Sequence, residues 1–200
     1  MKKYDTTAGA ILVGGHSRRM GKNKAFIEIG GKPIIERTIN ILKDIFKKII
    51  IVADVAEKYS LYKKDCLVVS DIIKDIGPLG GIHAALSYSE KDSVFFVACD
   101  MPYLKGDIIR KQLDYFHSIN CDILIPRIKD SIEPLHCIYR KIFKERIDAY
   151  VKTGEKYAMR RLFHTVNTHY WEIEDTSFYK SIFMNLNTPE DLANFIENPS

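Results

Sequence analysis

The chain has 200 residues, 46% hydrophobic and 28% charged, which is enough for one domain whose core needs no disulfide or structural metal. This composition excludes disorder, collagen-like repeats and coiled coil, and no apolar run approaches the roughly 18 to 20 residues of a membrane span. The formal charge of +4 lies below that of a dedicated nucleic-acid binder and fits a polyanionic small substrate or a solubilising surface.

Short apolar runs alternate with helical patterns as far as Arg127. The expected strands are residues 7–13, 49–53, 67–70, 93–99 and 122–126, and the expected helices are residues 33–46, a segment from 77–81 to about 88, and 106–117. Pro33 suits a first helical position. This order predicts an α/β fold: a three-layer, Rossmann-like, mostly parallel sheet with helices on both faces.

The alternation weakens beyond Arg127. Residues 134–140 and 168–173 are further strand candidates, and residues 141–151 and 156–163 have a helical pattern. The last helix is well marked, because Thr188 can serve as N-cap, Pro189 suits the first turn and Asp191 stands at the capping-box position. With no repeat, low-complexity tract or linker, we expect a single domain over residues 1–200.

Cysteine and histidine spacing argues against a zinc site. The four cysteines form no CxxC pair, and three lie among apolar residues, as reduced buried thiols do. His164 and His169 are five positions apart, which is not the spacing of a helical zinc pair. The N-terminus lacks a signal-peptide cleavage pattern, so we expect a cytoplasmic protein.

Chemistry-bearing residues follow four of the expected strands. These are residues 14–24, Asp71, Asp100 and Arg127. Because ligands of open α/β sheets collect at the carboxyl ends of the strands, this convergence predicts a ligand site at one edge of the sheet.

Residues 12–25 read LVGGHSRRMGKNKA and give the strongest local signal. Gly14 and Gly15 let the backbone approach a ligand closely, and exposed amides in such a turn can bind phosphates. Four basic residues follow within seven positions and could neutralise a triphosphate: Arg18, Arg19, Lys22 and Lys24. The stretch fits neither a Walker loop nor GxGxxG, and alone it could be a glycine-rich turn with solvated charges.

Two other segments support a nucleotide site. Asp100 ends a strand and suits a Mg²⁺ that bridges protein and phosphates, although an aspartate there can also be a cap or turn former. Residues 77–81, GPLGG, are either a helix lead-in or a place where a flat nucleobase lies against the backbone.

Residues 12–25 resemble the signature LxGGxSxRMGxxKA of the molybdenum cofactor guanylyltransferases, a branch of the nucleotidyltransferases that act on sugars, polyols and pterins. The resemblance continues in order through residues 31–33, 77–81, 99–102, 133–136 and 185–192, so it covers nearly the whole chain. It implies a nucleotide-diphospho-sugar transferase type of fold, with residues 1–127 binding the nucleotide and residues 128–200 the acceptor.

The reaction that this resemblance implies is transfer of GMP from GTP to the terminal phosphate of molybdopterin, with Mg²⁺ as cofactor and pyrophosphate as product. The implied nucleotide-binding residues are Leu12, Val13, Gly14, Gly15, Lys24, Asp71, Pro78 and Asp100. Arg19, Lys24 and Asp100 would be catalytic, with Asp100 the metal ligand, while Asn185 and Asn187 would bind the acceptor or merely form a loop. Partners would be GTP, molybdopterin or molybdenum-molybdopterin, and other proteins of the same biosynthesis, with no nucleic acid and no membrane.

The sequence leaves alternatives open. Val52 stands where some relatives carry an asparagine at the end of the second strand, and Asp54 is the nearest polar side chain, which weakens the case for guanine over another base. Asp75 lies close enough to Asp71 that either could meet the nucleotide. A cytidylyltransferase of the same cofactor, a sugar-phosphate nucleotidyltransferase and a non-catalytic nucleotide-binding module are the competing interpretations.

Overall fold

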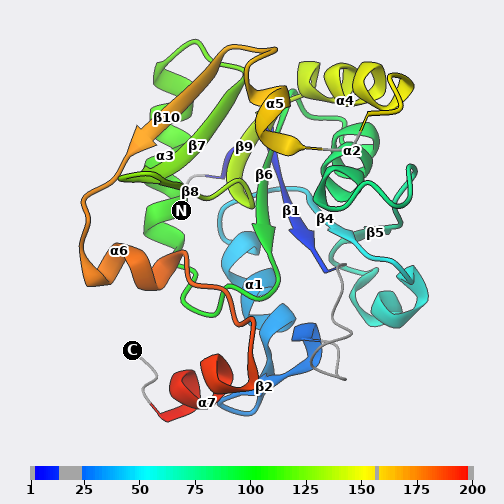
Figure 1. Cartoon of the computed structure of the whole chain (residues 1–200). Helices are drawn as coiled ribbons and strands as arrows, with labels where there is room; N and C mark the ends of the chain where they lie inside the picture. The colour runs from blue at the N-terminus through cyan, green and yellow to red at the C-terminus, as the bar shows by residue number, and fades with distance from the viewer. Residues whose placement is uncertain (1–2, 14–23, 156–157, 198–200) are drawn as a thin grey trace.

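The computed structural model describes residues 3–13, 24–155 and 158–197. Its centre is an eight-stranded sheet with the strand order β10-β7-β9-β6-β1-β4-β5, to which β8 adds by pairing with β7 (Figure 1). Strands β2 and β3 form a separate two-stranded sheet. The predicted mostly parallel α/β fold is confirmed, because β1 pairs in parallel with β4 and β6, β4 with β5, and β7 with β10.

The strands are β1 (Thr7–Leu12), β2 (Glu28–Ile29), β3 (Lys32–Pro33), β4 (Ile49–Val52), β5 (Leu67–Val69), β6 (Ser93–Ala98), β7 (Ile123–Ile128), β8 (Ser131–Ile132), β9 (His136–Arg140) and β10 (Thr168–Glu172). The α-helices are α1 (Ile34–Lys43), α2 (Pro78–Tyr88), α3 (Gly106–Ser118), α4 (Ile142–Lys152), α5 (Met159–Phe163), α6 (Ser177–Ile182) and α7 (Pro189–Glu197). Two 3₁₀ helices, η2 (Lys24–Phe26) and η3 (Ala56–Tyr62), complete the described elements.

Apolar side chains cover both faces of the central strands. Every residue of β1, β4 and β6 is buried, as expected for continuous apolar runs in a parallel sheet. On one face, α1 and α3 pack through residues such as Ile39 and Leu113, and on the other α2 and α4 pack through residues such as Ile82 and Phe143. These are the three predicted layers. All four cysteines are free and buried, three of them as their apolar neighbours predicted.

The start of α1 differs from the prediction. Pro33 precedes the helix in an extended conformation, with φ −54° and ψ 142°, and belongs to the β2–β3 hairpin. The hairpin forms because Gly30 and Gly31 both have positive φ, which a two-residue turn between twisted strands requires. The Gly-Gly pair was the available signal for this unpredicted hairpin.

The second half of the sheet contains an inserted strand. Strand β9 lies between β6 and β7 and runs antiparallel to both. The strand itself was expected, whereas its position and direction were not, and neither were β8 and α6. An antiparallel strand begins at the edge where its parallel neighbours end, so β9 brings the residues before it to the carboxyl edge of the sheet.

Helix α7 begins with the predicted capping box. Thr188 Oγ1 accepts a hydrogen bond from Asp191 N at 3.1 Å, and Asp191 Oδ2 accepts one from Thr188 N at 2.8 Å. The helix lies beside the β2–β3 hairpin (Figure 1), where Phe195 and Leu186 share an apolar cluster with Ile29. No helix among the described residues is long and apolar enough to cross a membrane.

His136, the first residue of β9, is completely buried. Its ring lies edge-on to Phe95 and Phe183, with ring centroids 5.0 and 4.9 Å away, and neither ring nitrogen has a hydrogen-bond partner among the described residues. Burial therefore lowers its pKa to about 4.

Acid should destabilise the protein through His136. The unfolded chain takes up this proton below about pH 6.5 and the folded chain only near pH 4, so stability falls as the pH drops between these values. We expect urea unfolding at pH 7 and pH 5 to show that wild type loses about 2 kcal/mol more than His136→Leu. The exposed His164, replaced by leucine, is the control, and an equal pH dependence of wild type and His136→Leu would contradict this account.

Candidate functional site

Three polar side chains from distant parts of the chain meet at the carboxyl edge of the sheet. Lys24 Nζ, at the start of η2, donates to Asp100 Oδ2 at 3.0 Å and to Asn187 Oδ1 at 3.3 Å. We call Lys24, Asp100 and Asn187 the central cluster. The side chains of Lys24 and Asp100 are only 14% and 19% exposed, so water screens their mutual attraction less than it does in a surface ion pair.

Backbone hydrogen bonds fix the segment that carries Asn187. Leu186 N donates to the Asp100 carbonyl at 2.9 Å, and Asp191 Oδ2 accepts from Asn187 N at 2.8 Å. Asp191 thus caps α7 and positions Asn187 at the same time. The capping pattern was visible in the sequence, but this second role was not recognised there.

Asn185 has a different environment from Asn187. Its side-chain amide donates to the Phe183 carbonyl at a long 3.5 Å, and its side chain is half-buried. Of the two asparagines that the sequence grouped together, the structure joins Asn187 directly to Lys24, while Asn185 lies two residues before it.

Asp71 lies beyond the end of β5, against the start of α2. A β-carbon on Gly80 would come within 3.1 Å of Asp71 Oδ2, and one on Gly81 within 3.8 Å of Asp71 Oδ1. Partial burial and, secondly, the nearby Asp54 carboxylate raise the pKa of Asp71. Asp71 therefore packs against the glycines of α2, whereas Asp75 is exposed.

The glycines of α2 serve close packing. A β-carbon on Gly80 would lie 2.7 Å from the Ile73 carbonyl oxygen, and one on Gly81 would lie 3.0 Å from Leu12 Cδ2. Both glycines are buried within the helix. Helix α2 begins at Pro78, so residues 78–81 belong to the helix rather than lead into it, and Gly77 precedes it with φ +61°. The nucleobase role of residues 77–81 stays a prediction.

The end of β1 is held on both sides by the sheet. The Leu12 carbonyl accepts from Cys99 N at 3.1 Å, and Val13 N donates to the Val52 carbonyl at 2.9 Å. Both side chains are buried. Leu12 and Val13 are thus fixed between β4 and the residue that precedes Asp100. The predicted residues Gly14, Gly15, Arg18, Arg19 and Lys22 lie outside the described residues.

Arg127 does not join the central cluster. Its Nε donates to Glu172 Oε1 at 2.8 Å, and its guanidinium lies 4.7 Å from the centre of the Tyr170 ring. With Arg160 and His164 it lines an open hollow of about 380 Å³ beside β10 and α5. Of the four strand ends that were predicted to share one site, the structure brings Lys24 and Asp100 into contact, while Asp71 lies against α2 and Arg127 pairs with Glu172.

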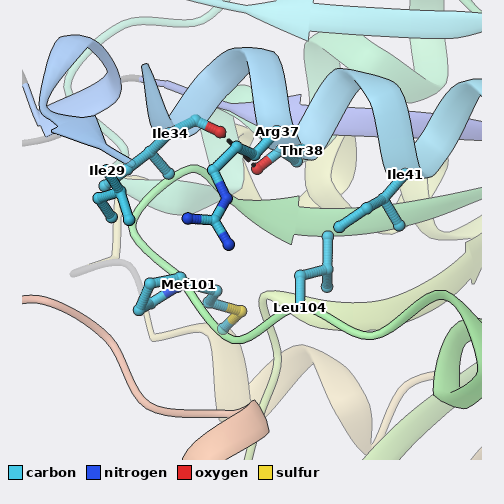
Figure 2. A pocket seen from close by; sticks show the side chains of 8 residues that line it. Ile29, Ile34, Arg37, Thr38, Ile41, Met101 and Leu104 are labelled. Carbon is cyan, nitrogen blue, oxygen red and sulfur yellow. Dashed lines mark hydrogen bonds between the residues drawn. The ribbon is translucent and has the colours of Figure 1, made fainter. Parts of the chain in front are cut away.

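A small hollow lies behind the loop that follows Asp100. Figure 2 shows Arg37 extending from α1 toward Met101 and Leu104, with Ile29 and Ile34 at one end. Its volume of about 30 Å³ is that of a single water, which is too small for a nucleotide. The hollow therefore marks the packing of this loop on α1.

The residues present fit a Mg²⁺ ion held mainly by substrate. Within the described part of the chain, no group of three or more histidine, cysteine or acidic residues could hold a metal. The central cluster offers one carboxylate and one amide oxygen, from Asp100 and Asn187. Mg²⁺ is commonly bound by one or two carboxylates plus phosphate and water oxygens, so this set suits a metal that arrives with a triphosphate.

Residues 9–169 match the family model of the MobA-like NTP transferase domain. The chain belongs to this family. A probable molybdenum cofactor guanylyltransferase of Peptoclostridium acidaminophilum is 40% identical, the alignment covering 92% of this chain and 86% of that protein. The molybdenum cofactor guanylyltransferase of Vibrio parahaemolyticus serotype O3:K6 is 36% identical over 94% of each chain.

Solved structures agree with membership of the MobA-like family. Molybdopterin-guanine dinucleotide biosynthesis protein A from Archaeoglobus fulgidus superposes with a TM-score of 0.79 at 26% identity, covering 95% of this chain and 97% of that one. A 4-diphosphocytidyl-2C-methyl-D-erythritol synthase from Anaerococcus prevotii has a TM-score of 0.70 at 14% identity, covering 96% and 94% of the two chains, which shows the shared fold alone.

Gly80→Ala should be destabilising, because its β-carbon would press on the Ile73 carbonyl and on Asp71. We expect a loss of about 2 kcal/mol in the free energy of unfolding, as for other overpacked sites, measured by urea denaturation. Gly106→Ala is the matched control, since its β-carbon would meet only two side-chain carbons, at 3.6 and 3.7 Å. Equal stabilities of the two variants would refute the packing role of Gly80.

Proposed function

We propose that this chain transfers GMP from GTP to the terminal phosphate of molybdopterin and releases pyrophosphate, in a Mg²⁺-dependent reaction. The central cluster is the observation that carries the proposal, because it places a cation and a carboxylate side by side at the ligand-binding edge of the sheet. The names of the relatives support guanylyl transfer in particular.

Catalysis on this basis is positioning and electrostatic stabilisation. The attacking atom is a phosphate oxygen that is already ionised, so the reaction needs no general base. Lys24, together with Arg19, neutralises the triphosphate as negative charge develops on the leaving pyrophosphate. Asn187 accepts a hydrogen bond from Lys24 and so holds its ammonium group toward Asp100.

Asp100 is the proposed Mg²⁺ ligand. The ion, when bound, supplies positive charge at the phosphates. Lys24 bonds Oδ2 of Asp100, and the carboxylate offers a second oxygen to the metal. Lys24 and Asp100 thus present a cation to the phosphates and an anion to the metal of a metal–triphosphate.

The two halves of the chain divide the substrates between them in this proposal. Residues 1–127 bind GTP through Leu12, Val13, Gly14 and Gly15 and through Asp71 and Pro78 beside α2. Residues 128–200 bind the acceptor, with Asn185 and Asn187 on the segment that reaches Asp100. Support comes from the hydrogen bond between Leu186 N and the Asp100 carbonyl, which brings the second half to the edge of the first.

Asp100→Asn should lower guanylyl transfer about a hundredfold or more while the protein stays folded, because asparagine keeps an oxygen for Lys24 and loses the charge. Lys24→Ala should weaken GTP binding. The activity of both variants is measured as the rate of pyrophosphate release with GTP, Mg²⁺ and molybdopterin. Lys47→Glu, at an exposed ion pair with Asp5, is the control and should retain activity. Full activity in either cluster variant would disprove the assignment.

Nucleotide selectivity is the second test of the function. We expect calorimetric titration with GTP, CTP, ATP and UTP, each with Mg²⁺, to show a clear preference for GTP. Val52 is buried and cannot hydrogen-bond to a base through its side chain, so the base must be read by other groups near the ends of β1 and β5. A preference for CTP would leave the proposed mechanism unchanged and identify the activity as cytidylyl transfer.

A further inference from the structure

Glu133 is a half-buried carboxyl group that the proposed reaction has not used. It lies in the connection between β8 and β9. Burial alone raises its pKa to about 7. Within residues 3–13, 24–155 and 158–197, no side chain hydrogen-bonds or ion-pairs with this carboxyl group. A carboxyl that is kept partly from water and has no partner among these residues is costly, and groups with pKa values perturbed in this way concentrate at functional sites.

The antiparallel direction of β9 places Glu133 at the active edge of the sheet. Glu133 N donates to the Pro126 carbonyl at 3.1 Å, and its carbonyl accepts from His136 N at 3.1 Å. Two residues on, the Leu135 carbonyl accepts from Ala98 N at 3.0 Å, and Ala98 is two residues before Asp100. Glu133 therefore lies between the ends of β6 and β7, next to the strand that delivers Asp100.

This position belongs to the acceptor side of the site. The predicted nucleotide side is formed by β1, by Asp71 and by α2, which lie on the other side of β6 in the strand order. On the Glu133 side, the ring of His136 contacts that of Phe183, at the start of the segment that carries Asn185 and Asn187. The turn that carries Glu133 therefore leads directly into the residue of β9 that packs against this segment.

A carboxylate here suits one part of the proposed acceptor. The 2-amino-4-oxo edge of a pterin ring carries an amino group and a ring N–H side by side, and a carboxylate accepts both hydrogen bonds in the two-pronged geometry that it makes with a guanidinium. We propose that Glu133 binds this edge of the acceptor's pterin ring and so selects the acceptor; the inference rests on the proposed function.

Guanine is the competing ligand, because it has the same pair of donors. The placement of Glu133 beyond β6, away from Asp71 and α2, favours the acceptor over the nucleotide. The two ligands make opposite kinetic predictions, since a guanine contact would change the KM for GTP and a pterin contact the KM for molybdopterin.

The first test is steady-state kinetics of Glu133→Gln. Glutamine keeps the shape and loses the charge and one acceptor oxygen, so the KM for molybdopterin should rise about tenfold while kcat and the KM for GTP change less than twofold. Glu145→Gln, at an exposed carboxyl of α4, is the matched control. An unchanged KM for molybdopterin, or an increased KM for GTP, would overturn the proposal.

The second test does not depend on turnover. Free pterin and lumazine differ in that lumazine carries an oxygen where pterin carries the amino group, and both are fluorescent enough for direct titration. Wild type should bind pterin at least tenfold more tightly than lumazine, and Glu133→Gln should lose most of this preference. If Glu133→Gln does not fold, Glu133→Asp keeps the charge one methylene further back and should weaken pterin binding.

The two tests separate the two levels of the proposal. Wild type that favours pterin through Glu133 but transfers no guanylyl group to molybdopterin would disprove the proposed function and retain the pterin contact. If wild type performs the transfer, but neither wild type nor Glu133→Gln distinguishes pterin from lumazine, the proposed function stands and only the role of Glu133 is disproved.

Discussion

Asp100 connects the three parts of the chain that form the site: β6, η2 and the segment before α7. Its carboxylate accepts a hydrogen bond from Lys24, and its backbone carbonyl accepts one from Leu186. The first bond holds the start of η2, and the second holds the segment that precedes α7. The buried strand β6 positions Asp100 itself. A rigid strand end thus sets the geometry of two less regular segments, which is the arrangement that an electrostatic site requires.

The inserted antiparallel strand β9 decides which residues of the second half of the chain reach the carboxyl edge of the sheet. A purely parallel sheet would bring only strand ends to the ligand edge, whereas an antiparallel strand brings its beginning there. The residues just before β9, including Glu133, consequently lie beside the end of β6. The same strand separates β6 from β7, so Arg127 comes to lie two strands away and pairs with Glu172 on β10.

Local signals in the sequence predicted the central fold well. The continuous apolar runs of β1, β4 and β6 favour strands buried on both faces of a parallel sheet, and the apolar face of α1 favours a helix that packs on such a sheet. The position of β9 was not predictable, because strand order depends on long-range pairing that no local pattern records. The hairpin β2–β3 is different, since its Gly30-Gly31 turn was a legible signal.

The candidate site was predictable to a similar extent. Lys24, Asp71 and Asp100 were identified from their places after expected strands, and parallel pairing then brings them to one edge. Asn187 was named through the resemblance alone, and its bond to Lys24 spans 163 positions in the chain. Glu133 lies in a motif that was noticed, but its partial burial depends on β9 and could be found only in three dimensions.

The double use of Asp191 has a consequence for how the protein is made. Synthesis proceeds from the N-terminus, so the sheet strands from β1 to β10 are complete before residues 187 and 191 emerge. Until they do, Lys24 lacks its second acceptor and the segment beside Asp100 lacks its cap. A nascent chain in which every strand of the sheet has been synthesised therefore still lacks part of its central cluster, because Asn187 has not yet been made.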